Sequence, residues 1–238
     1  MSEREVAARL AELDWEGIES ALRSRGHART AKLLSAAECR SLIALYPDDG
    51  RFRSRVDMAR HRFGEGDYAY FAEPLPPLVT ALRGAFYRRL APLANRMNEE
   101  MGREARYPPT LQAYRRRCRA AGQSKPTPLL LHYRAGGYNR LHRDLYGPLT
   151  FPLQAAVMLS RPGTDYEGGE FLLVENLPRQ QSRGEAIRAG RGEVVIFPVF
   201  ERPVAGKRGT LRAAMRHGAS RLHRGERYVL GLIFHDAE

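Results

Sequence analysis

The strongest constraint on the fold is a series of short β-rich segments that begins after about residue 125. Turn signals separate them, namely Gly168-Gly169, Gly190, Gly192 and Gly225. No helical periodicity lies between the segments, and short strands with frequent turns are typical of antiparallel sandwiches and barrels. The segments are 129–133, 154–159, 170–174, 193–197, 215–220 and 228–234. Residues 125–238 are therefore predicted to form an antiparallel sandwich or barrel.

The first 124 residues have a different pattern, which is mostly helical. Ser35 and Glu38 have the spacing of a capping box at the start of an apolar segment. Apolar residues recur every three or four positions from Leu78 to Met101, which predicts a long amphipathic helix. Segments 53–58 and 67–71 are candidate short strands. We predict an α+β, mainly β fold in which a helical layer, residues 1–124, packs on the 125–238 sheets as one integrated domain.

Composition excludes several classes of protein. The chain has 238 residues and two cysteines, Cys39 and Cys118, so it is not a disulfide-rich scaffold. It has no CxxC motif for a thiolate zinc site. No apolar stretch approaches the roughly 18–20 residues that span a bilayer, and the N-terminal residues are charged rather than signal-like. A cytoplasmic protein without a membrane partner is expected.

The net charge of +12 suggests an anionic partner but does not identify one. All but three of the 39 basic residues are arginine, a skew that genome composition can also produce. The excess is spread over both halves of the chain, and the densest basic window runs from Arg202 to Arg227. Nucleic acid is thus left open by the charge but is not favoured over a solvated arginine-rich surface.

The residues with the clearest chemical potential are His142 and Asp144, an HxD pair. Two residues apart on a strand, their side chains lie on the same side. With a second histidine, His217, they would form a facial triad that binds iron(II) and leaves positions open. Arg227 lies ten residues past His217, just after Gly225. A strand, a turn and a returning strand could bring its guanidinium beside the metal, where it would grip one carboxylate of a diacid.

In this context the chain resembles the iron(II)- and 2-oxoglutarate-dependent dioxygenases, in particular their prolyl-4-hydroxylase-like branch. Tyr133 to Asp144, with its glycine pair, is similar to the branch's lead-in to HxD. Segments 168–171 and 192–197 resemble two of its conserved strand approaches. Segment 217–227 fits its histidine–glycine and glycine–x–arginine ending. The likeness covers roughly residues 129–234 and is specific only in combination.

The resemblance implies a double-stranded β-helix, the cupin-like jelly roll. It implies that His142, Asp144 and His217 bind Fe(II), which makes them the catalytic residues. Arg227 would pair with the distal carboxylate of 2-oxoglutarate, and the hydroxyl of Tyr133 would contact the same cosubstrate. The reaction would use O2, with ascorbate as a candidate reductant, and would give succinate, carbon dioxide and a hydroxylated substrate.

The substrate is left with several alternatives. The prolyl-hydroxylase-like lead-in and the His-to-Arg spacing favour hydroxylation of an unactivated C–H bond on a prolyl or other amino-acyl side chain of a protein. The basic charge favours oxidative demethylation of an alkylated nucleic-acid base, and a small metabolite is a third option. A different class altogether would be a non-catalytic cupin-like module that binds iron or 2-oxoglutarate.

Overall fold

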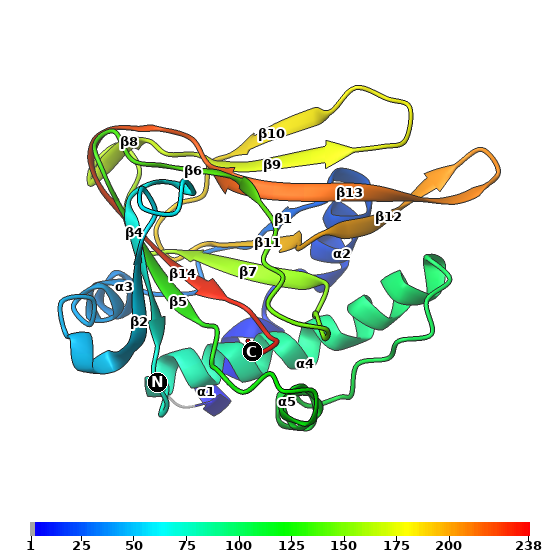
Figure 1. The fold of residues 1–238 in the computed structure, drawn as a ribbon, viewed down its shortest axis with the longest axis horizontal. Helices are drawn as coiled ribbons and strands as arrows, with labels where there is room; N and C mark the ends of the chain where they lie inside the picture. Colours follow the sequence, from blue (N-terminus) through cyan, green and yellow to red (C-terminus); the bar gives the residue numbers. More distant parts are fainter. Residues whose placement is uncertain (1–2) are drawn as a thin grey trace.

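Two antiparallel β-sheets stack face to face, and helices cover the outer side of the larger one (Figure 1). The computed structural model describes residues 3–238. Every strand pair in the two sheets is antiparallel. This architecture confirms the predicted double-stranded β-helix with a helical layer.

The larger sheet combines strands from both halves of the chain. The N-terminal strands β2 (Phe52–Asp57) and β4 (Asp67–Phe71) extend it beyond β5 (Leu129–Arg134), so segments 53–58 and 67–71 are strands as predicted. Its spatial order is β1 (Ala28–Arg29), β11 (Val194–Pro198), β7 (Leu153–Met158), β14 (Leu222–Leu232), β5 (Leu129–Arg134), β4 (Asp67–Phe71) and β2 (Phe52–Asp57), with β8 (Tyr166–Gly168) paired to β14.

The smaller sheet carries the two predicted histidine ligands. Its order is β10 (Arg183–Ile187), β9 (Phe171–Asn176), β13 (Gly209–Ala219), β6 (Tyr138–His142) and β3 (Gly64–Glu65), with β12 (Glu201–Gly206) paired to β13. The polar stretch 177–191, which reads as a loop, contains the edge strand β10. Its exposed polar residues need no apolar alternation, because pairing with β9 alone holds this strand.

Alternation along β7 divides the core into two layers. Ala155 and Val157 pack in the layer shared with the helices, whereas Ala156 and Met158 face the smaller sheet. The second layer lies between the two sheets and lines one side of the site described below.

The helical layer is built mainly around α4 (Pro77–Glu100), the long helix predicted from the apolar stripe. It lies with α1 (Glu3–Ala11) and α5 (Leu111–Ala120) below the larger sheet in Figure 1. The remaining helices are α2 (Trp15–Arg25), α3 (Ala36–Ile43) and the 3-10 turn η1 (Asp49–Arg51). The capping box at the start of α3 is present, with Ser35 and Glu38 bonded reciprocally.

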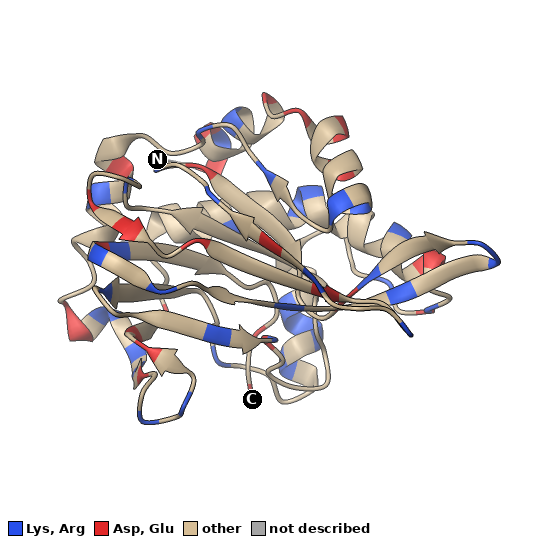
Figure 2. Cartoon of the chain, turned by 90° about the horizontal axis from the view of Figure 1, so that it is seen from above, with Lys and Arg blue, Asp and Glu red and all other residues tan. Residues whose placement is uncertain are grey.

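Lysine and arginine positions are distributed along the whole fold and are interspersed with aspartate and glutamate positions (Figure 2). Some of the basic window does not reach the surface at all, because Arg202 is buried against Glu175, with Nε and Oε2 2.5 Å apart. No helix within residues 3–238 is both long and apolar enough to cross a lipid bilayer.

Candidate active site

A cavity of about 400 Å³ opens between the two sheets, and all five predicted site residues line it. They come from three separate stretches of the chain. His142 is the last residue of β6 and Asp144 follows that strand, His217 lies on β13, and Tyr133 and Arg227 lie opposite each other on β5 and β14. The topology therefore brings together residues that are nearly 100 positions apart in the sequence.

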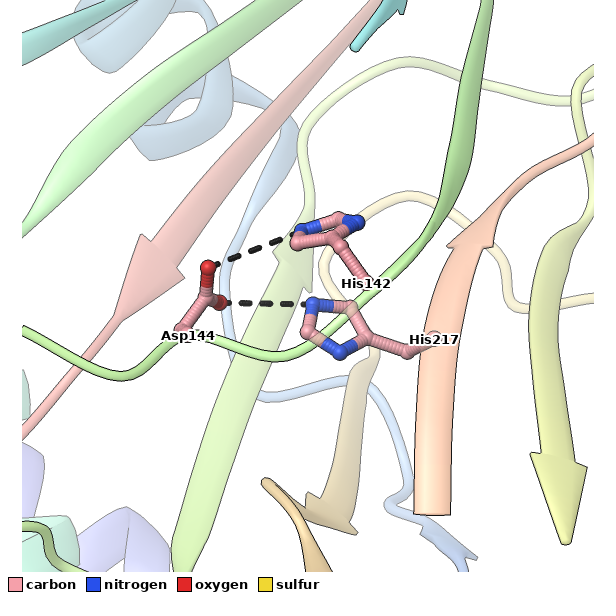
Figure 3. A group of neighbouring side chains, drawn as sticks. All are labelled: His142, Asp144 and His217. Carbon is pink, nitrogen blue, oxygen red and sulfur yellow. Dashed lines mark ion pairs between the residues drawn. The ribbon is translucent and has the colours of Figure 1, made fainter.

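The two histidines and the aspartate converge on one point (Figure 3). His142 and His217 are direct partners in the β6–β13 register, and their ring centroids are 4.3 Å apart. The Nε2 atom of His142 lies 3.5 Å from Oδ1 of Asp144, and that of His217 lies 3.3 Å from Oδ2. One ligand atom from each side chain lies within 4.8 Å of the others.

Two glycines of the predicted motif explain how the strands reach this geometry. A Cβ on Gly218 would lie 2.6 Å from the carbonyl oxygen of Asn139 on β6, so only glycine allows β13 to approach so closely. Gly225 has φ +78°, and a Cβ there would meet the Asp165 carbonyl. Glycine adopts that conformation without steric cost. It allows β14 to bend past β8 and return toward the cavity with Arg227.

Hydrogen bonding presets the tautomer of His142. Its Nδ1 lies 2.7 Å from the carbonyl oxygen of Arg140, which can only accept, so Nδ1 carries the hydrogen. Nε2 therefore presents a lone pair toward Asp144. Burial, followed by repulsion from His217, lowers the pKa of His142 and favours this neutral form.

The second histidine is held by packing instead. His217 is buried and its ring is parallel to that of Phe171, with centroids 5.9 Å apart. Its Nδ1 has no hydrogen-bond partner among the described residues. Only Nε2 faces the polar part of the site.

Neutral donors hold the carboxylate of Asp144 from both sides. The Tyr146 hydroxyl donates to Oδ1 at 2.8 Å, and the Gln154 side-chain amide donates to Oδ2 at 2.9 Å. Burial alone would raise the pKa of Asp144, but the hydrogen bond and charge of His217, the charge of His142 and the Tyr146 bond hold it well below its usual range. The carboxyl group is thus ionised, which is the form that could bind a metal ion.

Sequence reasoning missed both Tyr146 and Gln154. A signal for Gln154 was present, since it is a lone polar residue within the apolar run 151–159. Tyr146 gave no comparable signal, because it lies in a segment without regular structure.

Arg227 is a buried cation without a counter-charge. Only 3% of its surface is exposed, and no carboxylate among the described residues forms an ion pair with it. One terminal nitrogen lies 3.6 Å from the Met158 sulfur, and Nε has no partner. Its guanidinium carbon lies 5.5 Å from the centroid of the Tyr133 ring. A buried, unpaired guanidinium is costly unless a ligand supplies an anion.

Tyr133 completes this end of the cavity. It is 2% exposed, and burial, although opposed by the charge of Arg227, raises its pKa to about 12. The hydroxyl is therefore protonated at neutral pH and can donate a hydrogen bond to an acceptor in the cavity.

The residues present fit a six-coordinate first-row metal ion. Ligand atoms about 2.1 Å from such an ion and at right angles lie about 3 Å from one another. The 3.3 and 3.5 Å separations around Asp144 are close to that spacing. Two imidazoles and one carboxylate are the donor set of non-haem iron(II) sites with open positions. Arg227 and Tyr133 supply a place for an anion in the same cavity.

Comparison with known proteins places this site in a family context. Residues 66–237 match the family Oxygenase-NA, described as "Oxygenase, catalysing oxidative methylation of damaged DNA". The uncharacterized protein Rv2227 of Mycobacterium tuberculosis (strain ATCC 25618 / H37Rv) is 47% identical over 167 residues, which cover 70% of this chain and 72% of that protein.

Solved structures share the fold at low sequence identity. An oxidoreductase of the 2OG-Fe(II) oxygenase family from Burkholderia pseudomallei superposes with a TM-score of 0.53 at 15% identity, covering 95% of this chain and 93% of the other. A prolyl hydroxylase from Trichoplax adhaerens, in complex with a hypoxia inducible factor peptide fragment, gives a TM-score of 0.54 at 15% identity, with coverage of 93% and 89%.

Proposed function

This chain belongs to the Oxygenase-NA family, which confirms the resemblance to 2-oxoglutarate/iron(II) oxygenases seen in the sequence, and we propose that it removes N-methyl groups from damaged nucleic acid. An enzyme of this class uses iron(II) as cofactor and 2-oxoglutarate and O2 as cosubstrates. The family match also argues against the alternative of a non-catalytic cupin-like module.

One observation carries the assignment of 2-oxoglutarate to this cavity. A guanidinium that is 97% buried has no carboxylate partner among residues 3–238, yet it lines the same cavity as three convergent side chains that could hold a metal ion. A diacid could satisfy both features, with one end at the metal and the other at Arg227. No other described feature of the cavity accounts for an unpaired cation at this depth.

The roles of the side chains follow from their positions. His142, His217 and Asp144 would hold the metal through Nε2, Nε2 and a carboxylate oxygen. Arg227 would bind the distal carboxylate, and Tyr133 would donate its hydroxyl hydrogen to the same group. Bound iron(II) with 2-oxoglutarate would supply the activation of O2 for insertion of one oxygen atom into a substrate C–H bond.

Neighbouring side chains hold the candidate metal-binding residues in fixed positions. Tyr146 and Gln154 fix both oxygens of Asp144, so the carboxylate cannot rotate away from the two imidazoles. The apolar rings of Phe171 and Phe197 shield His217 and leave only one of its nitrogens for a ligand.

An oxygenase would oxidise the methyl group, and this oxidation ends in removal of the group from the base. One oxygen atom of O2 converts N–CH3 to N–CH2OH, and the other is incorporated into succinate as 2-oxoglutarate loses carbon dioxide. The hydroxymethyl group then leaves nitrogen as formaldehyde, and the ring nitrogen recovers a proton. The target base must leave its stack to enter the cavity between the sheets.

The test is product formation from a defined substrate. An oligonucleotide with one N-methylated base is incubated with protein, Fe(II), ascorbate and 2-oxoglutarate, and formaldehyde and succinate are quantified. We expect the two products in equal amounts. Stimulated succinate without formaldehyde, from a proline-containing peptide and not from the oligonucleotide, would move the assignment to an amino-acyl substrate.

The prolyl substrate favoured by the sequence motifs stays a prediction. The similarity to prolyl hydroxylases is at 15% identity and concerns the fold. The family description is therefore the more direct argument for the substrate, and it supports nucleic acid.

A further inference from the structure

The mouth of the cavity combines exposed arginines with exposed apolar side chains. Arg62, Arg140 and Arg143 all line it and are exposed, and none of the three forms an ion pair with a described acidic residue. The apolar side chains of Phe63 and Leu141, which are 47% and 39% exposed, also line the mouth. We define these five residues as the rim.

The rim has an unbalanced charge next to the reaction site. Among residues 3–238, Asp144 is the only acidic residue that lines the cavity, and the two histidines and its hydrogen-bond donors already surround it. An incoming molecule therefore meets cationic groups and apolar surface, without a carboxylate to repel an anion. A polyanion fits this pattern better than a neutral peptide.

Phe63 is fixed in its exposed position by the backbone. Its N–H donates to the Met58 carbonyl at 2.9 Å, and its carbonyl accepts from the Arg140 N–H at 2.8 Å. The preceding residue, Arg62, has φ 60°, which is uncommon outside glycine, asparagine and aspartate. The turn that carries both side chains is thus bound to β6, the strand that carries His142.

The Phe63 ring is also half of a stack. The His61 ring lies parallel to it within 21°, with centroids 5.4 Å apart. Stacked aromatic rings on a surface favour a further flat ring on the open face, and nucleobases provide one. Bases inside a duplex are already stacked and present no free face, so the rim suits an unpaired strand.

We propose that the rim binds single-stranded nucleic acid, with Arg62, Arg140 and Arg143 on the phosphates and Phe63 stacked on the base beside the one in the cavity. This rests on the proposed function and names the strand state and the residues that would select it. Residues 62 and 63 precede the family match, which begins at residue 66, so this part of the rim is a feature of this chain outside the matched region.

The experiment measures binding of a fluorescent oligonucleotide by anisotropy, with protein, Fe(II) and 2-oxoglutarate kept free of oxygen. Single-stranded and duplex forms of one sequence are compared at several salt concentrations. The variants are Phe63→Ala and Arg62→Gln. The matched control is Arg119→Gln, an exposed arginine without an ion pair among the described residues, on α5 at the opposite side of the fold (Figure 1).

We expect the wild type to bind the single strand more tightly than the duplex. Phe63→Ala should weaken binding by about 5- to 150-fold, the effect of losing one base stack. Arg62→Gln should lower the salt slope by about 0.7, which is about fourfold in affinity at 0.15 M salt. Arg119→Gln should bind like the wild type.

Equal affinity for duplex and single strand, or wild-type binding by both rim variants, would overturn the proposal. A parallel assay of succinate from 2-oxoglutarate separates the two levels. Succinate formation together with oligonucleotide binding that is independent of the rim refutes the rim alone. Succinate formation by a wild type that binds no oligonucleotide refutes the rim and the nucleic-acid substrate together. No succinate under any condition refutes the proposed function.

Discussion

Two of the regions in which this protein places a guanidinium and a carboxylate away from solvent treat the charges in opposite ways. Below the larger sheet, Arg83 of α4 and Asp236 near the C-terminus are 1% and 0% exposed and form an ion pair of 2.8 Å. Arg115 binds the other oxygen of Asp236, also at 2.8 Å. Between the sheets, Arg227 has no carboxylate partner in the described part of the chain, and the hydrogen-bond donors to Asp144 from Tyr146 and Gln154 are neutral.

The difference separates structure from binding. The Arg83 cluster is closed, because each oxygen of Asp236 already has a cationic partner and the chain terminus is joined to α4. In the cavity, by contrast, opposite charges of the protein do not fully neutralise the carboxylate of Asp144 and the guanidinium of Arg227. Such an arrangement costs stability in the free protein and is expected where ligands provide the missing charges. A metal ion and a diacid are a matching pair of ligands.

The largest expected effect comes from opening the closed cluster. Arg83→Met removes one partner of a fully buried pair and leaves Asp236 with Arg115 alone. We expect a loss of about 3–5 kcal/mol in the free energy of unfolding. Urea unfolding followed by circular dichroism measures it, and a loss below about 1 kcal/mol would show that the pair is not structural.

Replacing the arginine of the cavity by methionine should weaken ligand binding and leave stability nearly unchanged, which is the opposite of the result expected for Arg83→Met. Arg227→Met should weaken 2-oxoglutarate binding by about 30-fold or more, because truncating a buried charge partner costs about 2–5 kcal/mol. The free energy of unfolding should stay within about 1 kcal/mol of wild type, since no ion pair is lost. Calorimetric titration of 2-oxoglutarate into the Fe(II)-loaded protein measures the affinity, and wild-type affinity would remove Arg227 from the site.

Ligands should stabilise the cavity region by mass action. With Fe(II) present, 2-oxoglutarate at 100 times its Kd should add about 2.7 kcal/mol. For a chain of this size that corresponds to a rise of about 5–11 °C in Tm. The rise should persist for Arg119→Gln and shrink strongly for Arg227→Met when both are scanned at equal ligand concentration. An equal rise for Arg227→Met would contradict the assignment.

The smallest effect concerns the neutral donors around Asp144. Tyr146→Phe removes one hydrogen bond to the carboxylate while keeping the ring, and we expect about tenfold weaker Fe(II) binding. Dialysis against graded Fe(II) concentrations measures this. Tyr70→Phe, which removes the next hydroxyl in the chain of bonds, is the control and should have a smaller effect. Equal effects would indicate a general loosening of the pocket.

The sequence predicted the residues of the cavity better than those of the Arg83–Asp236 cluster. His142, Asp144, His217 and Arg227 are recognisable because their spacing and adjacent glycines form local patterns that chemistry requires. The Arg83–Asp236 pair joins residues that are 153 positions apart and has no local pattern. Tyr146 was missed although it lies only two positions from Asp144, because its segment has no regular structure and no local pattern marks its hydroxyl as a donor.

The fold shows the same division. Apolar segments predicted the central strands of the larger sheet, because burial on both faces requires apolar side chains. The edge strands β10 and β12 were not predicted, because their side chains are largely polar or small and their pairing partners alone specify them. The predicted boundary at residues 124 and 125 stays a prediction, as does the cytoplasmic location.

The central claim is that the uncompensated charges of the cavity bind iron and 2-oxoglutarate for oxidation. The most direct measurement is succinate formed from 2-oxoglutarate with Fe(II), ascorbate and a methylated single-stranded oligonucleotide, for the wild type and for Asp144→Ala. The account predicts succinate from the wild type and its loss in Asp144→Ala, with a Tm that shows the variant is folded. Equal succinate from both proteins, or none from a folded and iron-loaded wild type, would contradict it.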